Sequence, residues 1–240
     1  MALKDDKTKV KVAEMFNNIA TKYDFLNKSL SLGTDIYWRK KIIANLPKKP
    51  NLTLLDLATG TADVPIACLT SHRKHDIHKI YGVDIAKDML QIGQEKVNKQ
   101  KLSHKIELHE GDATSLTFDD NTFDAVTISF GIRNVENTEK ALQEIYRVLK
   151  PNGKAIILEF SIPKNKLIKS GYLTYFRHVL PHIGGWLSGN KTAYTYLNQT
   201  VETFPYGKKF ENMMQDCQFK QTQHTPLTSG IATLYTGTKK

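Results

Sequence analysis

The feature that most constrains the fold is a ten-residue stretch in which an apolar run ends in a carboxylate and then turns through small residues. Residues 54–63 read Leu-Leu-Asp-Leu-Ala-Thr-Gly-Thr-Ala-Asp. The pattern predicts a strand, a tight turn around Gly60 and a helix that begins at Asp63. Because glycine has no Cβ, a ligand can lie close to the main chain and to the free N–H groups of the helix start. Asp56 adds negative charge there and favours a ligand with a cationic part. The single glycine argues against a dinucleotide-binding turn.

Strands and helices alternate through the middle of the chain. The expected strands cover residues 53–57, 79–84, 105–110, 123–129 and 154–160, and the expected helices cover residues 63–71, 86–99 and 138–150. Repeated β-α units of this kind predict an α/β fold with a doubly wound, mostly parallel sheet and right-handed crossovers. A Pro-Asn-Gly sequence at residues 151–153 predicts a turn before the last of these strands.

No linker, internal repeat or low-complexity tract divides the 240 residues, so we expect a single domain over residues 1–240. Its expected parts are a helical cap at 1–46, a ligand-binding sheet half at 47–161, an inserted helical cover at 162–204, and a closing helix and strand pair at 205–240. Apolar spacing predicts cap helices near 7–20 and 35–46, a closing helix at 207–217, and closing strands at 219–225 and 230–236.

The composition narrows the choice of partner and compartment. The chain has 34 Lys and Arg against 24 Asp and Glu, and its net charge of +10 favours an anionic partner. Positive charge scattered this widely is also typical of a solvated surface. Cys68 and Cys217 lie far apart without metal-binding spacing, so we expect no metal site and a reducing, cytoplasmic compartment. The sequence contains no apolar run long enough to predict a membrane-spanning helix, and its N-terminus lacks the apolar stretch of a secretion signal.

Three acidic residues stand at or just past the ends of three successive expected strands. Asp56, Asp84 and Asp112 are spaced 28 residues apart, which is about one β-α unit. The carboxyl ends of the strands border the ligand crevice of a doubly wound sheet, so these carboxylates should meet in one cleft. They suit a nucleoside that carries an amino acid: Asp84 for the ribose hydroxyls, Asp112 with Ala113 for the adenine edge, and Asp56 near the ammonium. A single Asp at a strand end is more often a helix cap.

The chain resembles the class I methyltransferases and, more narrowly, the C-methyltransferases of menaquinone and ubiquinone biosynthesis. The matching stretches are residues 15–24, 38–40, 56–63, 119–124, 127–135, 146–153, 158–161 and 194–197. The sequence Ser-Phe-Gly-Ile-Arg-Asn-Val at 129–135 is specific to this family, whereas the glycine turn marks only the superfamily. The chain departs from the family pattern at Thr59, where some members have glycine, and at Ala62, where glycine is usual. Alanine disfavours a positive φ at that position.

The resemblance implies a seven-stranded sheet and S-adenosylmethionine as the cofactor. The residues expected at the cofactor are Asp56, Gly60, Thr61, Asp84, Asp112, Ala113 and Ser129. The implied reaction is C-methylation of demethylmenaquinol to menaquinol, and a benzoquinol of the ubiquinone pathway is the alternative acceptor.

The resemblance also implies that a prenylated quinol is methylated at a ring carbon beside a hydroxyl group. Arg133 is the first candidate to stabilise the phenolate, because a guanidinium stays charged and donates in a fixed fork. Asn134 is a candidate to orient the ring oxygen, and Tyr23 and His178 are candidates for a proton relay. Three of these have a structural alternative: Arg133 pairs with a cap carboxylate such as Asp24, and Tyr23 and His178 are packed residues.

A polyprenyl tail and a basic surface together predict transient contact with the inner face of the cytoplasmic membrane. Glu159, at the end of the fifth expected strand, either fixes the cover or touches the substrate. We expect no nucleic-acid partner, because residues 129–131 do not match the Asn-Pro-Pro-Tyr signature of RNA-modifying methyltransferases. The glycine turn also disfavours an NAD-dependent oxidoreductase. The sequence does not decide between an enzyme and a non-catalytic regulator that binds S-adenosylmethionine. A homodimer is also compatible with it.

Overall fold

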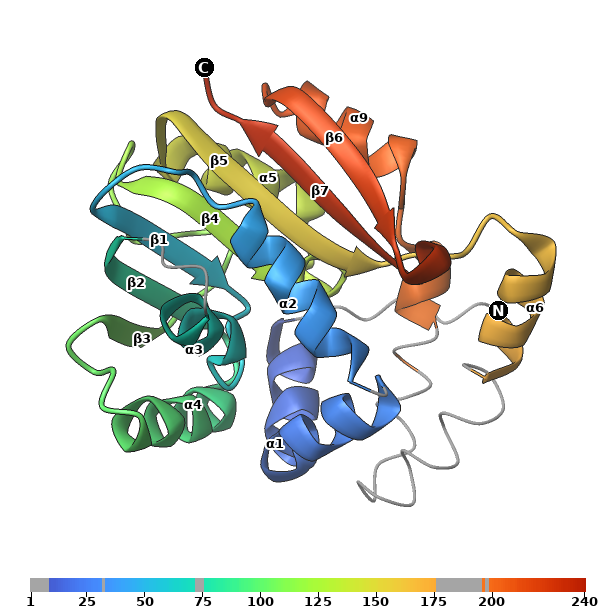
Figure 1. Ribbon diagram of the computed structural model, residues 1–240, viewed down its shortest axis with the longest axis horizontal. Coiled ribbons are helices and arrows are strands. Elements are labelled where there is room, and N and C mark those ends of the chain that lie inside the picture. The colour runs from blue at the N-terminus through green and yellow to red at the C-terminus, as the bar shows by residue number, and fades with distance from the viewer. Residues whose placement is uncertain (1–8, 32, 72–75, 176–195, 197–198) are drawn as a thin grey trace.

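The computed structural model describes residues 9–31, 33–71, 76–175, 196 and 199–240, and Figure 1 shows how their helices and strands are arranged. One seven-stranded sheet has the order β3-β2-β1-β4-β5-β7-β6. The strands are β1 Leu52–Leu57, β2 Ile77–Asp84, β3 Ile106–Glu110, β4 Phe123–Ser129, β5 Leu149–Phe160, β6 Lys220–Leu227 and β7 Ala232–Thr238. Strands β1 to β5 pair in parallel, whereas β7 is antiparallel to β5 and β6. The predicted doubly wound, mostly parallel α/β fold is confirmed.

The winding of the sheet reverses between β1 and β4. From β1 the chain moves outward to β2 and β3, and it then returns to place β4 on the other side of β1. Leu57 near the carboxyl end of β1 pairs with Val83 of β2 and with Ile128 of β4. The carboxyl ends of these three strands therefore border one crevice, at the place where open α/β sheets bind ligands.

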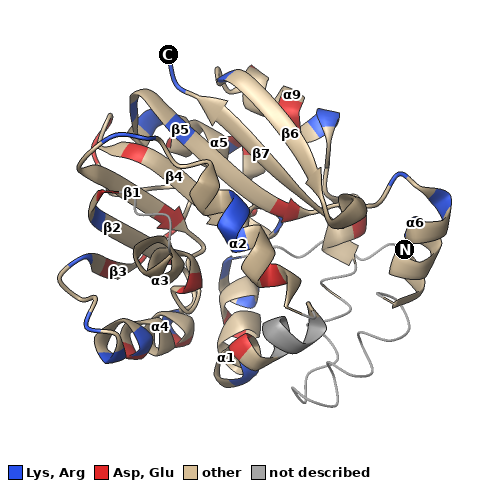
Figure 2. Ribbon diagram, in the orientation of Figure 1, with Lys and Arg blue, Asp and Glu red and all other residues tan. Residues whose placement is uncertain are grey.

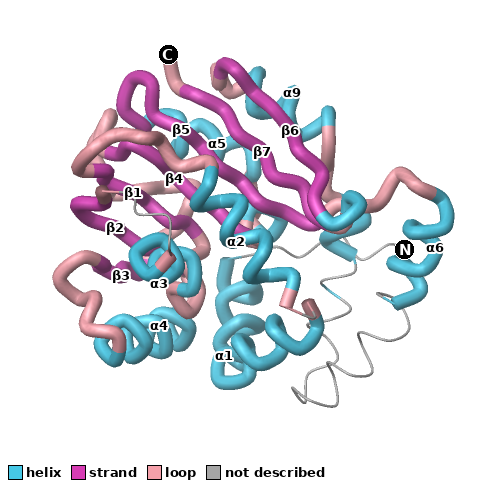
Figure 3. Tube along the Cα trace, in the orientation of Figure 1, coloured by secondary structure: helices cyan, strands magenta, loops and turns pink. Residues whose placement is uncertain are grey.

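Helices cover both faces of the sheet (Figures 1 and 3). Helices α5 Thr138–Val148 and α9 Lys208–Asp216 pack on one face, and helices α2 Thr34–Ala44, α3 Asp63–Thr70 and α4 Lys87–Lys99 pack on the other. Side chains alternate between these two layers along a strand: Leu55 and Leu57 belong to the first core and Leu54 to the second. The buried strands are apolar on both faces for this reason.

The first helix is longer than predicted. Helix α1 runs from Lys9 to Leu30 and packs on α4, whereas the apolar spacing predicted an end near residue 20. Phe16 and Tyr23 lie two turns apart and pack edge to face with ring centroids 6.2 Å apart, so the apolar side of the helix continues. Gly33, with φ +79, separates α1 from α2. The expected cover begins with α6 Lys166–Thr174, and residues 176–195 lie outside the described residues.

The turn predicted at residues 151–153 is wrong. Strand β5 already begins at Leu149, and its register against β4 shifts between Phe123 and Ala125. Asn152 takes a left-handed backbone with φ +63. The Pro-Asn-Gly sequence therefore forms an irregularity within β5, where the extra residues are accommodated beside a continuous neighbouring strand.

Helix α4 ends in a Schellman motif that has lysine at its left-handed position. Lys101 has φ +58 and an exposed side chain, and the N–H of Leu102 donates to the Val97 carbonyl at 3.0 Å. We expect Lys101→Gly to raise the free energy of unfolding by about 0.5–1 kcal/mol, because glycine adopts this backbone without a Cβ clash. Urea unfolding measures the change. Lys99→Gly, in the last turn of the same helix, should lower stability by a similar amount, and a loss in both variants would contradict the prediction.

Candidate active site

The glycine turn after β1 is held by the carboxylate that ends β2. Gly60 has φ +55, and its N–H donates to Oδ2 of Asp84 at 2.8 Å. The N–H of Ala86 donates to Oδ1 of Asp84, also at 2.8 Å. A Cβ built on Gly60 would have no neighbour within 4 Å, so open space lies against the turn. Burial raises the pKa of Asp84. A ligand that donates hydrogen bonds to this carboxylate would stabilise its charged form.

Ala62 adopts the left-handed backbone that its side chain disfavours. Its φ is +63 and its ψ is 26, at the N-cap of α3. This conformation costs alanine about 1 kcal/mol or more. The methyl group is fully buried in the core between α2 and the sheet, which offsets roughly 0.8 kcal/mol. The turn therefore keeps a glycine-like conformation, although the sequence led us to expect alanine to disfavour it.

Asp56 lies near the end of β1, just before the turn, and is almost fully buried. Its two oxygens accept hydrogen bonds from Thr59 Oγ1 at 2.7 Å and from Thr127 Oγ1 at 2.5 Å. Burial raises the pKa of Asp56 to about 7, although both hydroxyl groups favour the charged form. A cationic ligand group beside Asp56 would compensate this buried charge.

Asp112 lies just past β3 and contacts the first helix. It accepts hydrogen bonds from the backbone N–H and the hydroxyl of Thr114, at 2.9 and 2.6 Å, and forms a salt bridge with Lys9. Partial burial alone would raise the pKa of Asp112, but the hydrogen bonds from Lys9 and Thr114 hold it below its usual value. Helix α1 is thus tied to the far end of the crevice.

Two adjoining cavities occupy the crevice. The smaller, of about 80 Å³, is lined by Asp84, Asp112 and Ala113, and the larger, of about 550 Å³, is lined by Asp56, Thr61 and Arg133. Residues of α1, the turn and the end of β4 line both: Phe16, Tyr23, Ala58, Gly60, Ser129, Phe130 and Asn134. The structure therefore brings all seven expected cofactor residues to two cavities that share a wall, with Arg133, Asn134 and Tyr23 beside them. His178 lies outside the described residues.

Arg133 and Asn134 lie on a short 3-10 helix, Ile132–Asn134, directly after β4. The Arg133 Nη1 donates to Glu159 Oε1 at 2.6 Å and to the Phe130 carbonyl at 2.5 Å. Asp24, offered above as an alternative partner, does not form this pair. Burial raises the pKa of Glu159, although the adjacent guanidinium opposes the shift. Among the described residues, the buried Nε of Arg133 and Oδ1 of Asn134 have no hydrogen-bond partner. A polar ligand group in the cavity could satisfy both.

Asp24 instead joins α1 to the glycine turn, a contact that the sequence did not predict. It accepts a hydrogen bond from Thr61 Oγ1 at 2.6 Å and forms a salt bridge with Lys96 of α4 at 2.8 Å. Lys96 also forms a salt bridge with Asp63, which begins α3. Nothing in the local sequence pairs these residues, because the network forms only when three helices meet. It closes α1 over the cofactor residues.

Three aromatic side chains form a wall of the larger cavity, which we name the aromatic wall and which the sequence did not predict. Trp38 lies 5.3 Å from Phe130 and 6.1 Å from Phe160 between ring centroids, and the rings of Phe130 and Phe160 lie 4.3 Å apart. All three line the larger cavity. Their separation in sequence hides the cluster, and only the family-like stretches around each residue gave a signal.

A doubly wound sheet of this order, with a glycine turn after β1 and carboxylates at the ends of three successive strands, defines a class I methyltransferase. A structure described as a SAM-dependent methyltransferase, possible histamine N-methyltransferase, from Thermotoga maritima has the same fold. Its TM-score is 0.66 at 17% identity, over 95% of this chain and 99% of that one.

The chain belongs to the ubiE/COQ5 methyltransferase family, whose model matches residues 1–239. It is 45% identical to a demethylmenaquinone methyltransferase from Bacteroides fragilis, over 98% of this chain and 95% of the relative. It is 43% identical to a ubiquinone/menaquinone biosynthesis C-methyltransferase from Geotalea daltonii, over 95% of this chain and 96% of the relative. The expected class of enzyme, a methyltransferase, is confirmed.

Proposed function

We propose that the protein methylates a ring carbon of demethylmenaquinol to give menaquinol, with S-adenosylmethionine as the methyl donor. The observation that carries the proposal is the mostly apolar cavity of about 550 Å³ that extends between the glycine turn and Arg133. The names of the Bacteroides and Geotalea relatives support this chemistry. A benzoquinol of the ubiquinone pathway is the second candidate acceptor, since the Geotalea relative is named for both pathways.

The strand ends fit the donor chemically. Asp84 has acceptor capacity beyond its hydrogen bonds from the backbone of Gly60, Ile85 and Ala86, and it would bind the ribose hydroxyls. Asp112 with Ala113 would meet the adenine. Asp56 would lie near the ammonium group, and Ser129 lines both cavities. When bound, S-adenosylmethionine supplies a methyl group on a positively charged sulfur.

Arg133 would stabilise the quinol oxygen as it loses its proton. Its Nη1 is fixed by Glu159 and the Phe130 carbonyl, and the buried Nε has no hydrogen-bond partner within the described ranges. Donors held in a water-poor site are worth more to a developing negative charge than donors in water. Asn134 would orient the same oxygen. Tyr23 lines both cavities and, with His178, is proposed for the proton relay.

The aromatic wall, formed by Trp38, Phe130 and Phe160, would hold the quinol ring in a fixed position beside the methyl donor. Phe130, Phe160 and Trp38 present apolar rings to the larger cavity, and offset or edge contacts with a quinol ring are favourable. Helix α1 covers the same space through Phe16 and Tyr23 and would exclude water from it. Fixed placement of the two reactants is itself a large part of such catalysis.

The reaction can be tested directly with the purified protein. Radiolabelled S-adenosylmethionine is incubated anaerobically with a short-tailed demethylmenaquinol and, separately, with the corresponding benzoquinol. We expect label in a product one methyl group heavier, formed faster from the naphthoquinol. Label only in the benzoquinol would select the second candidate. Donor binding without methylation of either quinol would overturn the proposal and leave a cofactor-binding regulator.

We further propose that the protein acts at the inner face of the cytoplasmic membrane, because a polyprenyl tail partitions into lipid. Within the described ranges, no helix has the length and apolar character to cross a bilayer. Access to such a substrate would then depend on contact between the protein surface and the lipid.

A further inference from the structure

Helix α6 exposes apolar side chains among lysines. Leu167 is 85% exposed and Ile168 is 38% exposed, although helices of globular proteins usually turn such residues inward. Lysines 164, 166 and 169 surround them, and residues 163–175 include no acidic residue. Within α6, only Tyr172 is buried. The helix therefore presents a basic and apolar surface to its surroundings.

Residues 36–41 of α2, which follow the acidic Asp35 of its first turn, have the same character. Ile36 is 46% exposed and Tyr37 is 43% exposed, and the Lys41 Nζ lies 5.2 Å from the centre of the Tyr37 ring. Lys40 is exposed one turn after Ile36. Residues 36–46 contain no Asp or Glu. Figure 2 shows Lys and Arg on both α2 and α6.

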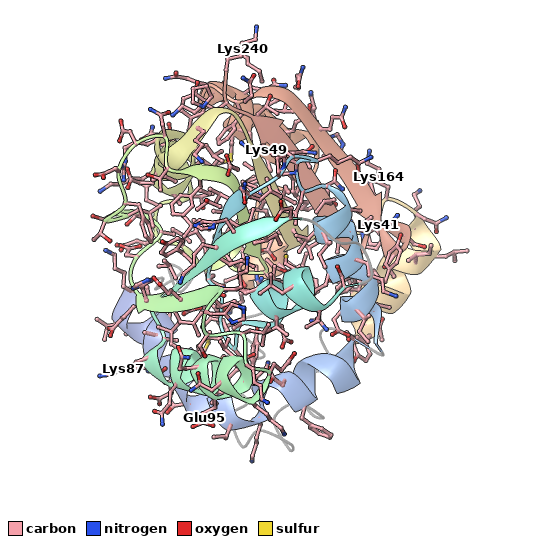
Figure 4. All side chains as sticks on the ribbon, turned by 60° about the vertical axis from the view of Figure 1, so that its left-hand side comes forward. Lys41, Lys49, Lys87, Glu95, Lys164 and Lys240 are labelled. Atoms are coloured by element: carbon pink, nitrogen blue, oxygen red, sulfur yellow. The ribbon has the colours of Figure 1, made fainter. Side chains whose placement is uncertain are left out.

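Both helices border the larger cavity. Thr34 and Trp38 of α2, and Ile168 and Tyr172 of α6, line it. Since Ile168 is also partly exposed, the cavity reaches the surface beside α6. Figure 4 shows Lys41 and Lys164 projecting from the same side of the molecule, with Lys87 of α4 on the other side. The exposed apolar residues thus flank an opening of the cavity that would hold the quinol.

We propose that this surface docks onto an anionic lipid bilayer. It consists of Ile36, Tyr37, Leu167 and Ile168 with Lys40, Lys41, Lys164, Lys166 and Lys169, and we name it the lysine-rimmed face. The inference rests on the proposed function, because docking there would let a prenyl tail pass from lipid into the cavity. Apolar insertion and attraction of lysines to anionic headgroups are each weak, and together they give reversible membrane binding.

Charge favours a bilayer over a second copy of the chain as the occupant. A symmetric dimer through the lysine-rimmed face would place the lysines of one copy against those of the other. The nearest acid on α2, Asp35, is already paired with Arg39 at 2.5 Å. An anionic surface complements this face, whereas its own copy does not.

The test measures binding of the full chain to phosphatidylcholine vesicles with and without phosphatidylglycerol at low salt. Leu167→Glu and the double variant K166E/K169E should each lower partition onto the anionic vesicles about tenfold or more. None of these residues lines the cavity. The matched control, K87E/K99E on α4, changes charge equally and should shift partition less than about twofold. Turnover of long-tailed demethylmenaquinol in vesicles should fall in parallel with partition, while turnover of a short-tailed quinol in solution stays unchanged.

Vesicle binding that is the same in wild type and both variants of the face would overturn the proposal. So would a wild-type dimer that Leu167→Glu converts to a monomer without loss of vesicle binding, since a second copy would then cover the face. Partition is measured on vesicles without substrate. Failure of the wild type to methylate the short-tailed quinol would therefore count against the proposed function alone.

Discussion

Replacing Arg133 with lysine is expected to lower the turnover of demethylmenaquinol by about 10²–10³-fold, the usual loss when one donor to a developing oxyanion is removed. Lysine keeps the charge that neutralises the buried Glu159, 2.6 Å from the guanidinium. It cannot, however, hold Glu159 and the Phe130 carbonyl and still present a second donor to the cavity. Alanine is a poorer test, because it would leave Glu159 buried without a countercharge at a cost of about 3–5 kcal/mol.

Arg147→Lys provides the matched control. Arg147 of α5 pairs with Glu144 on the same helix and with Asp120, which precedes β4, at 2.8 Å from each, and it lines neither cavity. Its replacement should leave turnover within about twofold, since lysine keeps the charge beside Glu144 and Asp120 and the side chain lies away from both cavities. Steady-state turnover and calorimetric titration of the donor are measured on both variants. A normal turnover in Arg133→Lys would show that Arg133 does not act on the quinol. An equal loss of donor affinity and turnover would show the same, because the effect would then lie in donor binding.

The sheet and its carboxylates could be predicted because their signals are local. Asp56, Asp84 and Asp112 each follow an apolar run. The β-α alternation implies parallel strands, and the carboxyl ends of parallel strands lie at the same edge of the sheet. The predicted strand positions agree with the structure to within a few residues, except in β5. There the Pro-Asn-Gly stretch pairs with the segment after β7, because the Asn152 N–H donates to the Lys239 carbonyl at 2.8 Å and the Lys239 N–H donates to the Gly153 carbonyl at 3.0 Å. The local sequence does not report these distant partners.

The contacts that close the site could not be predicted because they join distant segments. Asp24 meets Lys96, 72 residues away, only when α1 crosses α4 and the turn. Arg133 meets Glu159 because β4 and β5 are neighbours in the sheet, whereas the sequence suggested a cap carboxylate such as Asp24 as its partner. Ala62 shows a different reason why a local prediction fails. Alanine does disfavour a positive φ, but burial of its methyl group offsets part of the energetic cost, so the left-handed backbone is kept. Residue roles at the site stay predictions for the variants to decide.

Asp56→Asn is expected to stabilise the protein and weaken the donor complex at the same time. The pKa of Asp56 is raised by burial from an ordinary value of 3.8 to about 7. Between these values the folded protein holds a proton that the unfolded chain does not, so stability falls as pH rises through this window. Above about pH 7 the buried carboxylate costs up to about 4 kcal/mol, and asparagine should recover roughly 2–4 kcal/mol of that. Loss of the charged acceptor beside the ammonium should weaken donor binding about 10- to 100-fold.

Asp124→Asn is the matched control, for which we expect the opposite change in stability. Asp124 is equally buried, but hydrogen bonds from Lys49, Lys150 and the Thr53 N–H outweigh that burial and hold its pKa below the usual value. Its charge stabilises the fold above that pKa, so removal of the charge should destabilise the protein without changing donor affinity. Urea unfolding and donor titration between about pH 5.5 and 8.5 measure both effects. Wild-type affinity should fall up to tenfold per unit below about pH 7, as Asp56 takes up a proton, and Asp56→Asn should remove the part of that dependence that comes from Asp56 and leave the part that comes from Asp84. A wild-type affinity that is flat with pH, together with an Asp56→Asn variant that binds the donor normally, would show that Asp56 does not meet the ammonium group.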